Sequence, residues 1–194
     1  NQKKLSEFYE ELKRLNINTI RPDINKCNAD FSSDGINFLY ALGAIKSVGF
    51  EAISKIVEER KNNGDFKDLT DFINRVNPKD INKLQLEGLV KAGAFDNINS
   101  NRQSLFNSIP NIILKSKNIF ENNSANQVDL FKEDNDETYI ENTKDWNVDI
   151  KLSKEFETLG FFVSDHPLNQ YKSLFNQYNI IEYDEFNTNE NILS

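Results

Sequence analysis

The sequence predicts a mainly α-helical fold with a small β-hairpin near the N-terminus and a tandem helix-hairpin-helix domain. Three observations support this prediction. Apolar residues recur at helical spacing in several separate segments. Short breaks that contain glycine join such segments twice. One Asp-Gly pair lies between short apolar runs, as in a β-turn. With 194 residues, 38% of them hydrophobic and 28% charged, the chain is long enough for one domain or two small ones.

The first predicted element is an amphipathic helix that ends near Asn16. Its apolar stripe repeats at i, i+3, i+4 and i+7, through Leu5, Phe8, Tyr9 and Leu12. Pro22 then excludes a helix, because it has no backbone donor and forces the preceding residue into an extended conformation. After it, Asp34-Gly35 separates Phe31 from an alternating apolar run, which predicts the β-hairpin.

From residue 43 onward, short helices alternate with breaks. Apolar periodicity predicts four further helices, through residues 52–60, 69–76 and 81–90 and from about residue 100. Gly64 ends the first of these helices and Asn77-Pro78 ends the second. The arrangement of helix, hairpin and helix occurs twice, with breaks at residues 47–49 and 92–94.

Each hairpin is a candidate phosphate site. Small residues between two helices leave backbone N–H groups uncovered at the start of the second helix, where the helix dipole adds positive charge. Nearby cations would add attraction without reading bases, so we expect sequence-independent, salt-dependent binding of duplex DNA. The predicted DNA-binding residues are Lys46, Ser47, Val48, Gly49, Phe50, Lys55, Lys91, Ala92, Gly93, Ala94 and Arg102. The alternative is that Gly49 and Gly93 only end or start helices that pack together.

Charge divides the chain into two parts. Residues 1–118 contain 18 Lys and Arg against 15 Asp and Glu, a net charge of +3, whereas residues 119–194 contain 5 against 16, a net charge of −11. The acidic part is poorly suited to a phosphate backbone. DNA contact is therefore expected in the first part only.

Four ordered motifs carry a family resemblance. They are RPDINKCNADF, YALGAIKSVGFEAISKIVEER, LEGLVKAGAFD and TLGFFVSDHPL. In this order and spacing, between about Leu5 and Tyr178, the chain resembles the alpha subunit of bacterial DNA polymerase III, a C-family replicative DNA polymerase. The chain would then be a fragment of a longer protein. It departs from the family at Ser47, where the hairpin commonly has a glycine.

The resemblance implies a division of the chain. Residues 1–42 would be the end of the fingers region, 43–118 the tandem helix-hairpin-helix domain that holds the duplex, 119–150 an acidic linker with a clamp-binding peptide, and 151–194 a helical connection toward an oligonucleotide-binding barrel outside this chain. It also implies that the parent protein is a DNA-directed DNA polymerase that uses Mg²⁺ held by aspartates outside this chain. The fragment itself would need no cofactor and would not be active alone. Other polymerase III holoenzyme subunits would be partners through the parent chain.

The polar segment around residue 126 contains the motif QVDLF. It resembles the peptide by which bacterial replication proteins bind the β sliding clamp. Leu130 and Phe131 would enter an apolar pocket while the amide of Gln127 bonds its rim, and the ordering cost would be offset on binding. The predicted clamp-binding residues are Gln127, Val128, Asp129, Leu130 and Phe131. The alternative is that Leu130 and Phe131 fold back onto the helical domain.

Other sequence features point away from a catalytic or metal site. The single Cys27 excludes an internal disulfide, and no apolar run is long enough for a membrane span, so we expect the bacterial cytoplasm. His166 has no zinc-ligand spacing around it and is expected to shape a turn before Pro167. Trp146, with Val148 and Ile150, is expected to anchor the tail on the folded part. Two other function classes stay open, a helix-hairpin-helix module of a DNA repair protein and a protein-interaction domain that binds no DNA.

Overall fold

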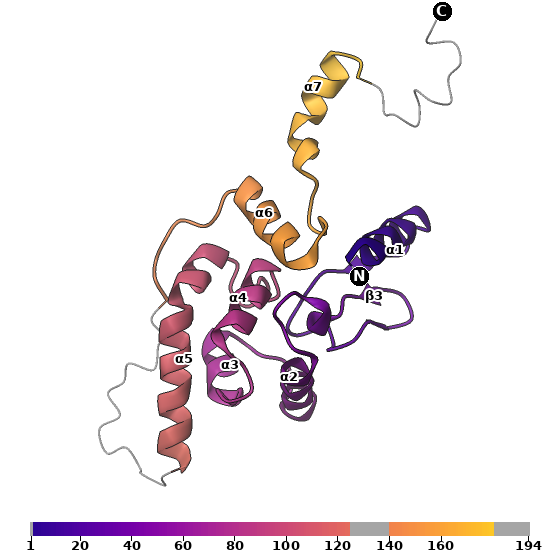
Figure 1. The fold of residues 1–194 in the computed structure, drawn as a ribbon. Helices are drawn as coiled ribbons and strands as arrows, with labels where there is room; N and C mark the ends of the chain where they lie inside the picture. The colour runs from indigo at the N-terminus through magenta and orange to yellow at the C-terminus, as the bar shows by residue number, and fades with distance from the viewer. Residues whose placement is uncertain (1, 125–139, 181–194) are drawn as a thin grey trace, which may run out of the picture.

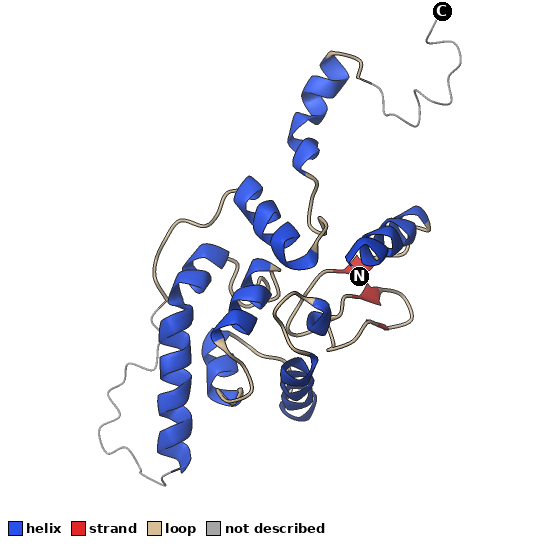
Figure 2. Cartoon of the chain, in the orientation of Figure 1, coloured by secondary structure: helices blue, strands red, loops and turns tan. Residues whose placement is uncertain are grey.

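The computed structural model describes residues 2–124 and 140–180 (Figure 1). It is mainly helical, with one small sheet near the N-terminus (Figure 2), as the sequence predicts. The described elements are α1 (Gln2–Arg14), β1 (Thr19–Ile20), β2 (Ser32–Ser33), β3 (Phe38–Leu39), η1 (Leu42–Ala44), α2 (Phe50–Asn63), α3 (Leu69–Arg75), α4 (Lys83–Lys91), α5 (Arg102–Ser124), α6 (Val148–Leu159), η2 (Pro167–Tyr171) and α7 (Lys172–Gln177).

The sheet contains the predicted hairpin and one strand that the sequence did not reveal. β2 and β3 pair antiparallel, and the turn between them is held by the carboxylate of Asp34, which accepts hydrogen bonds from the N–H groups of Ile36 and Asn37. β1 adds to the other side of β3 in parallel, giving the order β1-β3-β2. A strand of two residues is too short to give an alternating pattern, which is why only the tertiary structure shows β1.

Helices α2 to α5 form the body of the chain, and their apolar faces meet in one core. The helices predicted around residues 52–60, 69–76, 81–90 and from about 100 are all present. Edge-to-face ring contacts run from Phe66 to Phe72 and on to Phe95, each with centroids 5.1 Å apart. Leu84 lies within the helix predicted at 81–90 but is 62% exposed, because it stands on the side of α4 away from the buried Leu86 and Leu89.

Arg60 ties α2 to the segment after β1. The Arg60 side chain is buried and donates hydrogen bonds to the carbonyl oxygens of Ile24 and Cys27 and to Oδ1 of Asn28, at 2.7, 2.8 and 3.1 Å. These bonds satisfy main-chain acceptors that would otherwise be buried without a partner. These hydrogen bonds from Arg60 therefore fix residues 24–28 to α2.

The tail returns along α5 before it forms α6. The backbone N–H groups of Glu141 and Thr143 donate to the hydroxyl oxygens of Ser108 and Ser104 at 2.8 and 3.1 Å. Trp146 contacts Phe106 with ring centroids 5.5 Å apart, as expected of an anchor, whereas Val148 and Ile150, predicted to act with it, are 61% and 42% exposed. Figure 1 shows α6 lying over α4 and α7 extending away from the body. α5 continues past residue 118, the predicted domain end, to Ser124.

No described helix has both the length and the apolar character that crossing a membrane requires. His166 caps η2, where its Nδ1 accepts a hydrogen bond from the N–H of Leu168 at 3.2 Å. It therefore shapes the turn before Pro167, as predicted.

Candidate nucleic-acid interface

The first hairpin links η1 to α2 through a tight turn. Ser47 has a φ of +68°, a left-handed conformation that favours glycine. Val48 is buried, and its N–H donates to the carbonyl of Ile45 at 3.0 Å. The turn thus points its apolar residue inward and leaves Lys46 and Ser47 on the surface.

The start of α2 is open to solvent. Gly49 is the N-cap and offers no side chain to cap the helix, and both Gly49 and Phe50 are exposed. Within the described parts of the chain, the N–H groups of Gly49 and Phe50 meet no protein acceptor. The positive end of the helix dipole adds to these free donors. Glu51, in the first turn, already complements this dipole in part. The geometry suits an oxyanion that approaches along the helix axis.

The cations predicted beside the first hairpin differ in availability. The Lys46 side chain is exposed, and among the residues described it forms no ion pair. Its backbone N–H is used, because it donates to the carbonyl of Thr158 in α6 at 3.0 Å. Lys55 pairs with Asp80 and keeps 58% of its side chain exposed. Lys46 is therefore the charge best placed for a ligand of this hairpin.

The second hairpin has the same turn but a covered backbone. Gly93 has a φ of +78°, equivalent to Ser47, yet Ala92, Gly93 and Ala94 are all buried. The N–H of Gly93 donates to the carbonyl of Val90 at 3.0 Å, and the N–H of Ala94 donates to that of Leu89 at 2.9 Å. The predicted phosphate donors of this hairpin are thus already bonded within the protein.

The cations of the second hairpin are also paired. Arg102 is buried and donates from Nε and Nη2 to the two carboxylate oxygens of Asp96, at 2.8 and 2.7 Å. Lys91 donates to Glu157 of α6 at 2.8 Å and lies over the ring of Phe106. The hydrogen bond from Lys91 holds the pKa of Glu157 below its ordinary value. Free access of DNA to Lys91 and Arg102, which the sequence suggests, is therefore not seen in this arrangement.

The start of α5 is capped, unlike that of α2. The helix does not follow the hairpin directly but begins at Arg102, after a further turn. The side chain of Asn101 accepts from the N–H of Ser104 at 2.9 Å, and that of Asp145 accepts from the N–H of Gln103 at 3.1 Å. Carboxylate and amide oxygens therefore already occupy the place where a phosphate would bind.

Gly88 brings the two hairpins together. A Cβ at this position of α4 would lie 2.9 Å from Cγ2 of Val48 and 3.0 Å from the carbonyl oxygen of Lys46. Only a residue without a side chain lets the helix of the second hairpin approach the turn of the first this closely. The two hairpins therefore pack as one unit.

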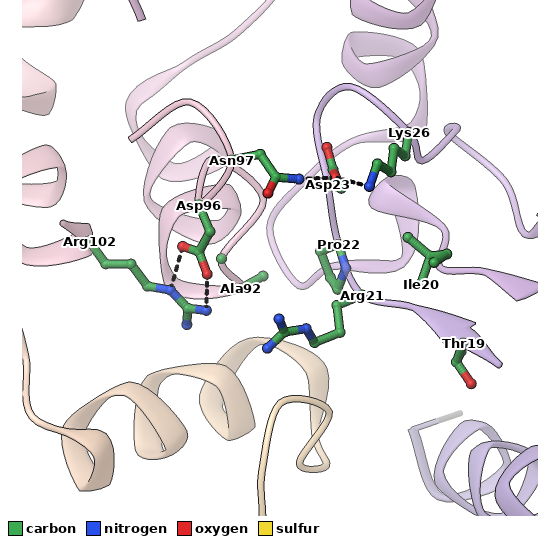
Figure 3. A pocket seen from close by; sticks show the side chains of 11 residues that line it. Thr19, Ile20, Arg21, Pro22, Asp23, Lys26, Ala92, Asp96, Asn97 and Arg102 are labelled. Atoms are coloured by element: carbon green, nitrogen blue, oxygen red, sulfur yellow. Dashed lines mark hydrogen bonds and ion pairs between the residues drawn. The ribbon is translucent and has the colours of Figure 1, made fainter. Parts of the chain in front are cut away.

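A polar cavity of about 210 Å³, which the sequence did not suggest, lies beside the second hairpin (Figure 3). Arg21, Pro22, Asp23 and Lys26 form one wall, and residues of the second hairpin and Arg102 form the other. The sequence analysis used Pro22, in the RPD motif of this wall, only to exclude a helix and did not predict a cavity.

The predicted clamp-binding residues 127–131 lie outside the described residues. In the ranges 2–124 and 140–180, no three His, Cys, Asp or Glu side chains come together as metal ligands would.

The helices and the two paired hairpins have the arrangement of tandem helix-hairpin-helix motifs. In agreement, the family described as helix-hairpin-helix motif matches residues 16–105. The chain is also similar to proteins named DNA polymerase III subunit alpha. It is 36% identical to the protein of Campylobacter jejuni, over 94% of this chain and 16% of the relative. It is 35% identical to the protein of Caulobacter vibrioides, over 87% of this chain and 15% of the relative. It is 33% identical to the protein of Rickettsia bellii, over 97% of this chain and 18% of the relative. The resemblance predicted from the sequence is thereby confirmed, and the chain is consistent with a fragment of a DNA polymerase III alpha subunit.

The chain spans less than a fifth of the length of these relatives. The helix-hairpin-helix match at residues 16–105 lies within this chain's own sequence.

Proposed function

We propose that this chain is the part of a replicative DNA polymerase that grips duplex DNA, and that it does so through the first hairpin. The observation that carries the proposal is the uncapped, exposed start of α2, where the N–H groups of Gly49 and Phe50 have no acceptor in the described ranges. A backbone phosphate of DNA would accept from both groups, and the exposed ammonium of Lys46 would add a point charge. Such contacts do not depend on base sequence, as a polymerase requires.

The second hairpin would take a smaller direct part. Its N–H groups are bonded internally, and Arg102 is bound to Asp96 on two sides. Lys91 would contact a phosphate only after its ion pair with Glu157 breaks. We therefore assign the second hairpin chiefly to holding the first in place, through the close approach at Gly88, with Lys55 and Lys91 as secondary charges.

The parent protein would carry out template-directed DNA synthesis, since the relatives of this chain are named as polymerase subunits. Its catalytic Mg²⁺ would be bound by aspartates outside this chain, and other holoenzyme subunits would bind elsewhere on the parent. We expect this work to take place in the bacterial cytoplasm. The fragment would bind duplex DNA and the sliding clamp and would carry out no chemical step.

We also propose that Gln127 to Phe131 bind the β sliding clamp. The motif pairs an amide with two large apolar side chains in a polar stretch of sequence, a pattern that suits docking in an apolar pocket. The test is binding to a purified bacterial clamp, with a variant that carries Gln127→Ala, Leu130→Ala and Phe131→Ala together. Loss of binding in the variant supports the site, whereas equal binding by both proteins rejects it.

The duplex proposal is tested by titrating DNA at several salt concentrations. Lys46→Glu should weaken binding and reduce the salt slope, because it removes one phosphate contact and adds repulsion. Glu51→Gln should have the opposite effect and tighten binding, because it removes the acidic group nearest the open helix end. Lys61→Glu, an equal charge change at the far end of α2, is the control.

Two outcomes would count against this function. An unchanged affinity and salt slope in both Lys46→Glu and Glu51→Gln would exclude the first hairpin. Absence of duplex binding by the wild-type protein even at low salt would favour a protein-interaction domain instead.

A further inference from the structure

The polar cavity beside the second hairpin has a surplus of hydrogen-bond donors. It is lined by residues of the segment after β1 and of the second hairpin, which we call together the Arg21 pocket: Thr19, Ile20, Arg21, Pro22, Asp23, Lys26, Ala92, Gly93, Asp96, Asn97 and Arg102. Three of these residues are cations and two are carboxylates. Figure 3 shows the Arg21 side chain pointing across the cavity towards Arg102. The question is which of these charges is already satisfied.

The backbone of Arg21 is held firmly in place. Pro22 is buried and restricts Arg21 to an extended conformation. The thiol of Cys27, whose pKa burial raises to about 11, stays protonated and donates to the carbonyl of Arg21 at 3.2 Å. The N–H of Ile24 donates to the carbonyl of Ala94 at 2.8 Å and so joins the two walls. The pocket is therefore a fixed feature of the fold and not a gap between loose loops.

Every carboxylate near the pocket already has partners. Arg102 takes both oxygens of Asp96. Asp23 is buried and accepts from Asn97 and from the N–H of Asn25. Glu155 of α6, on which the charges of Arg102 and Arg21 act, is buried and accepts from the N–H and hydroxyl of Ser164 at 2.9 and 2.6 Å. Each oxygen of these three carboxylates therefore already accepts a hydrogen bond from another group of the protein.

Arg21 is the cation left over. In the part of the chain that the structure describes, its guanidinium forms no hydrogen bond and no ion pair. Lys26 lies 3.8 Å from Asp23, too far for a hydrogen bond, and keeps 59% of its side chain exposed. A planar fork of five donors beside a cavity, where each neighbouring carboxylate already has other partners, matches a tetrahedral oxyanion.

We propose that the Arg21 pocket binds a phosphate group, held by the guanidinium of Arg21 with Lys26 as a second charge. Two sources supply a phosphate group of this chemistry: a free phosphate or pyrophosphate, and an internucleotide phosphate of bound DNA. Binding of the free anion does not rest on the DNA function proposed for the first hairpin.

The test uses pyrophosphate with the intact protein, in the presence of EDTA so that metal-dependent sites do not contribute. Isothermal titration should give a dissociation constant that Arg21→Gln weakens by about tenfold or more, the usual effect of losing a charged hydrogen bond. Arg21→Lys should fall between the two, because a lysine keeps the charge but not the fork. Arg14→Gln, the same change at an exposed pair with Glu11, should bind like the wild type.

Equal pyrophosphate affinity in the wild type and Arg21→Gln would overturn the proposal, provided that circular dichroism shows the variant to be folded. Absence of wild-type binding to both pyrophosphate and DNA would overturn it as well.

A second arm identifies the source of the phosphate. If DNA supplies it, a saturating duplex should displace pyrophosphate, and Arg21→Gln should reduce the salt slope of duplex binding by about one. If the anion is free, pyrophosphate should bind equally well with duplex present. Lys46→Glu separates the two proposals, because it should weaken duplex binding and leave pyrophosphate affinity in EDTA unchanged.

Discussion

The backbone N–H of Lys46 donates a hydrogen bond to the backbone carbonyl of Thr158, at 3.0 Å. This bond joins the turn of the first hairpin to the last part of α6, far along the sequence. α6 is in turn packed against the body through Leu152 and Leu159, both buried. The geometry of the first hairpin therefore depends on α6, which belongs to neither of the two hairpins.

Weakening the packing of α6 should loosen the first hairpin. Leu152→Ala removes a side chain that is 3% exposed and should lower the free energy of unfolding by about 2 to 5 kcal/mol. Hydrogen exchange at the Lys46 amide should become faster, because its acceptor moves. Val148→Ala, at a side chain that is 61% exposed on the same helix, should change neither quantity appreciably. Equal exchange at Lys46 in both variants would contradict this dependence.

The left-handed residue of the first turn offers a stabilising change. Ser47→Gly should raise the free energy of unfolding by up to about 1 kcal/mol, because glycine adopts a φ of +68° without the steric cost that a side chain incurs. Ser54→Gly, inside α2, should do the reverse and lower stability by about 0.5 to 1 kcal/mol. Urea unfolding of both variants measures the difference. A loss of stability in Ser47→Gly would show that the serine forms a contact that offsets its strain.

Arg60 should be the most sensitive charged residue of α2. Arg60→Ala leaves the carbonyl oxygens of Ile24 and Cys27 without their buried donor, so the free energy of unfolding should fall by at least about 3 kcal/mol. Lys61→Ala, at the next and exposed position, should change it by less than about 0.5 kcal/mol. Denaturant titrations compare the two. Similar stabilities would mean that the arginine is dispensable to the core.

Glu155 and Glu157, two residues apart on α6, should respond to pH in opposite directions. Burial raises the pKa of Glu155, although Ser164 and Arg102 act against this, whereas the hydrogen bond from Lys91 lowers the pKa of Glu157. The Glu155 contribution to stability is fully present below its unfolded pKa and is lost as the pH rises through the raised folded value. The Glu157 contribution is present above the unfolded pKa and is lost as the pH falls through the lowered one.

Stability measured from pH 3 to 7 in the wild type, Glu155→Gln and Glu157→Gln checks these signs. Relative to the wild type, Glu155→Gln should become more favourable as the pH rises. Glu157→Gln should become less favourable over the same range, by a small amount because this side chain is half exposed. Parallel curves for the two variants would contradict the assignment.

Local patterns predicted most of the secondary structure, for reasons that particular residues make clear. Apolar periodicity located α2 to α5, and Gly64 and Asn77-Pro78 located two of their ends. Asp34-Gly35 predicted the β-hairpin because its turn is held by the Asp34 side chain itself. β1 escaped prediction, since its two residues pair in parallel with a strand that lies well beyond them.

The sequence by itself determined that the arrangement of helix, hairpin and helix occurs twice in this chain, with breaks at residues 47–49 and 92–94. Only the tertiary structure decided that both turns use a left-handed residue, Ser47 in one and Gly93 in the other, and that the first hairpin is open and the second is covered. The partners that make this difference come from far along the chain or from the next turn: Glu157 binds Lys91, Asp96 binds Arg102, and Asp145 caps α5. The same is true of the Arg21 pocket, whose two walls meet through the bond from Ile24 to Ala94. Periodicity and turn chemistry act over a few residues, whereas burial and charge pairing depend on which distant segments the fold brings together.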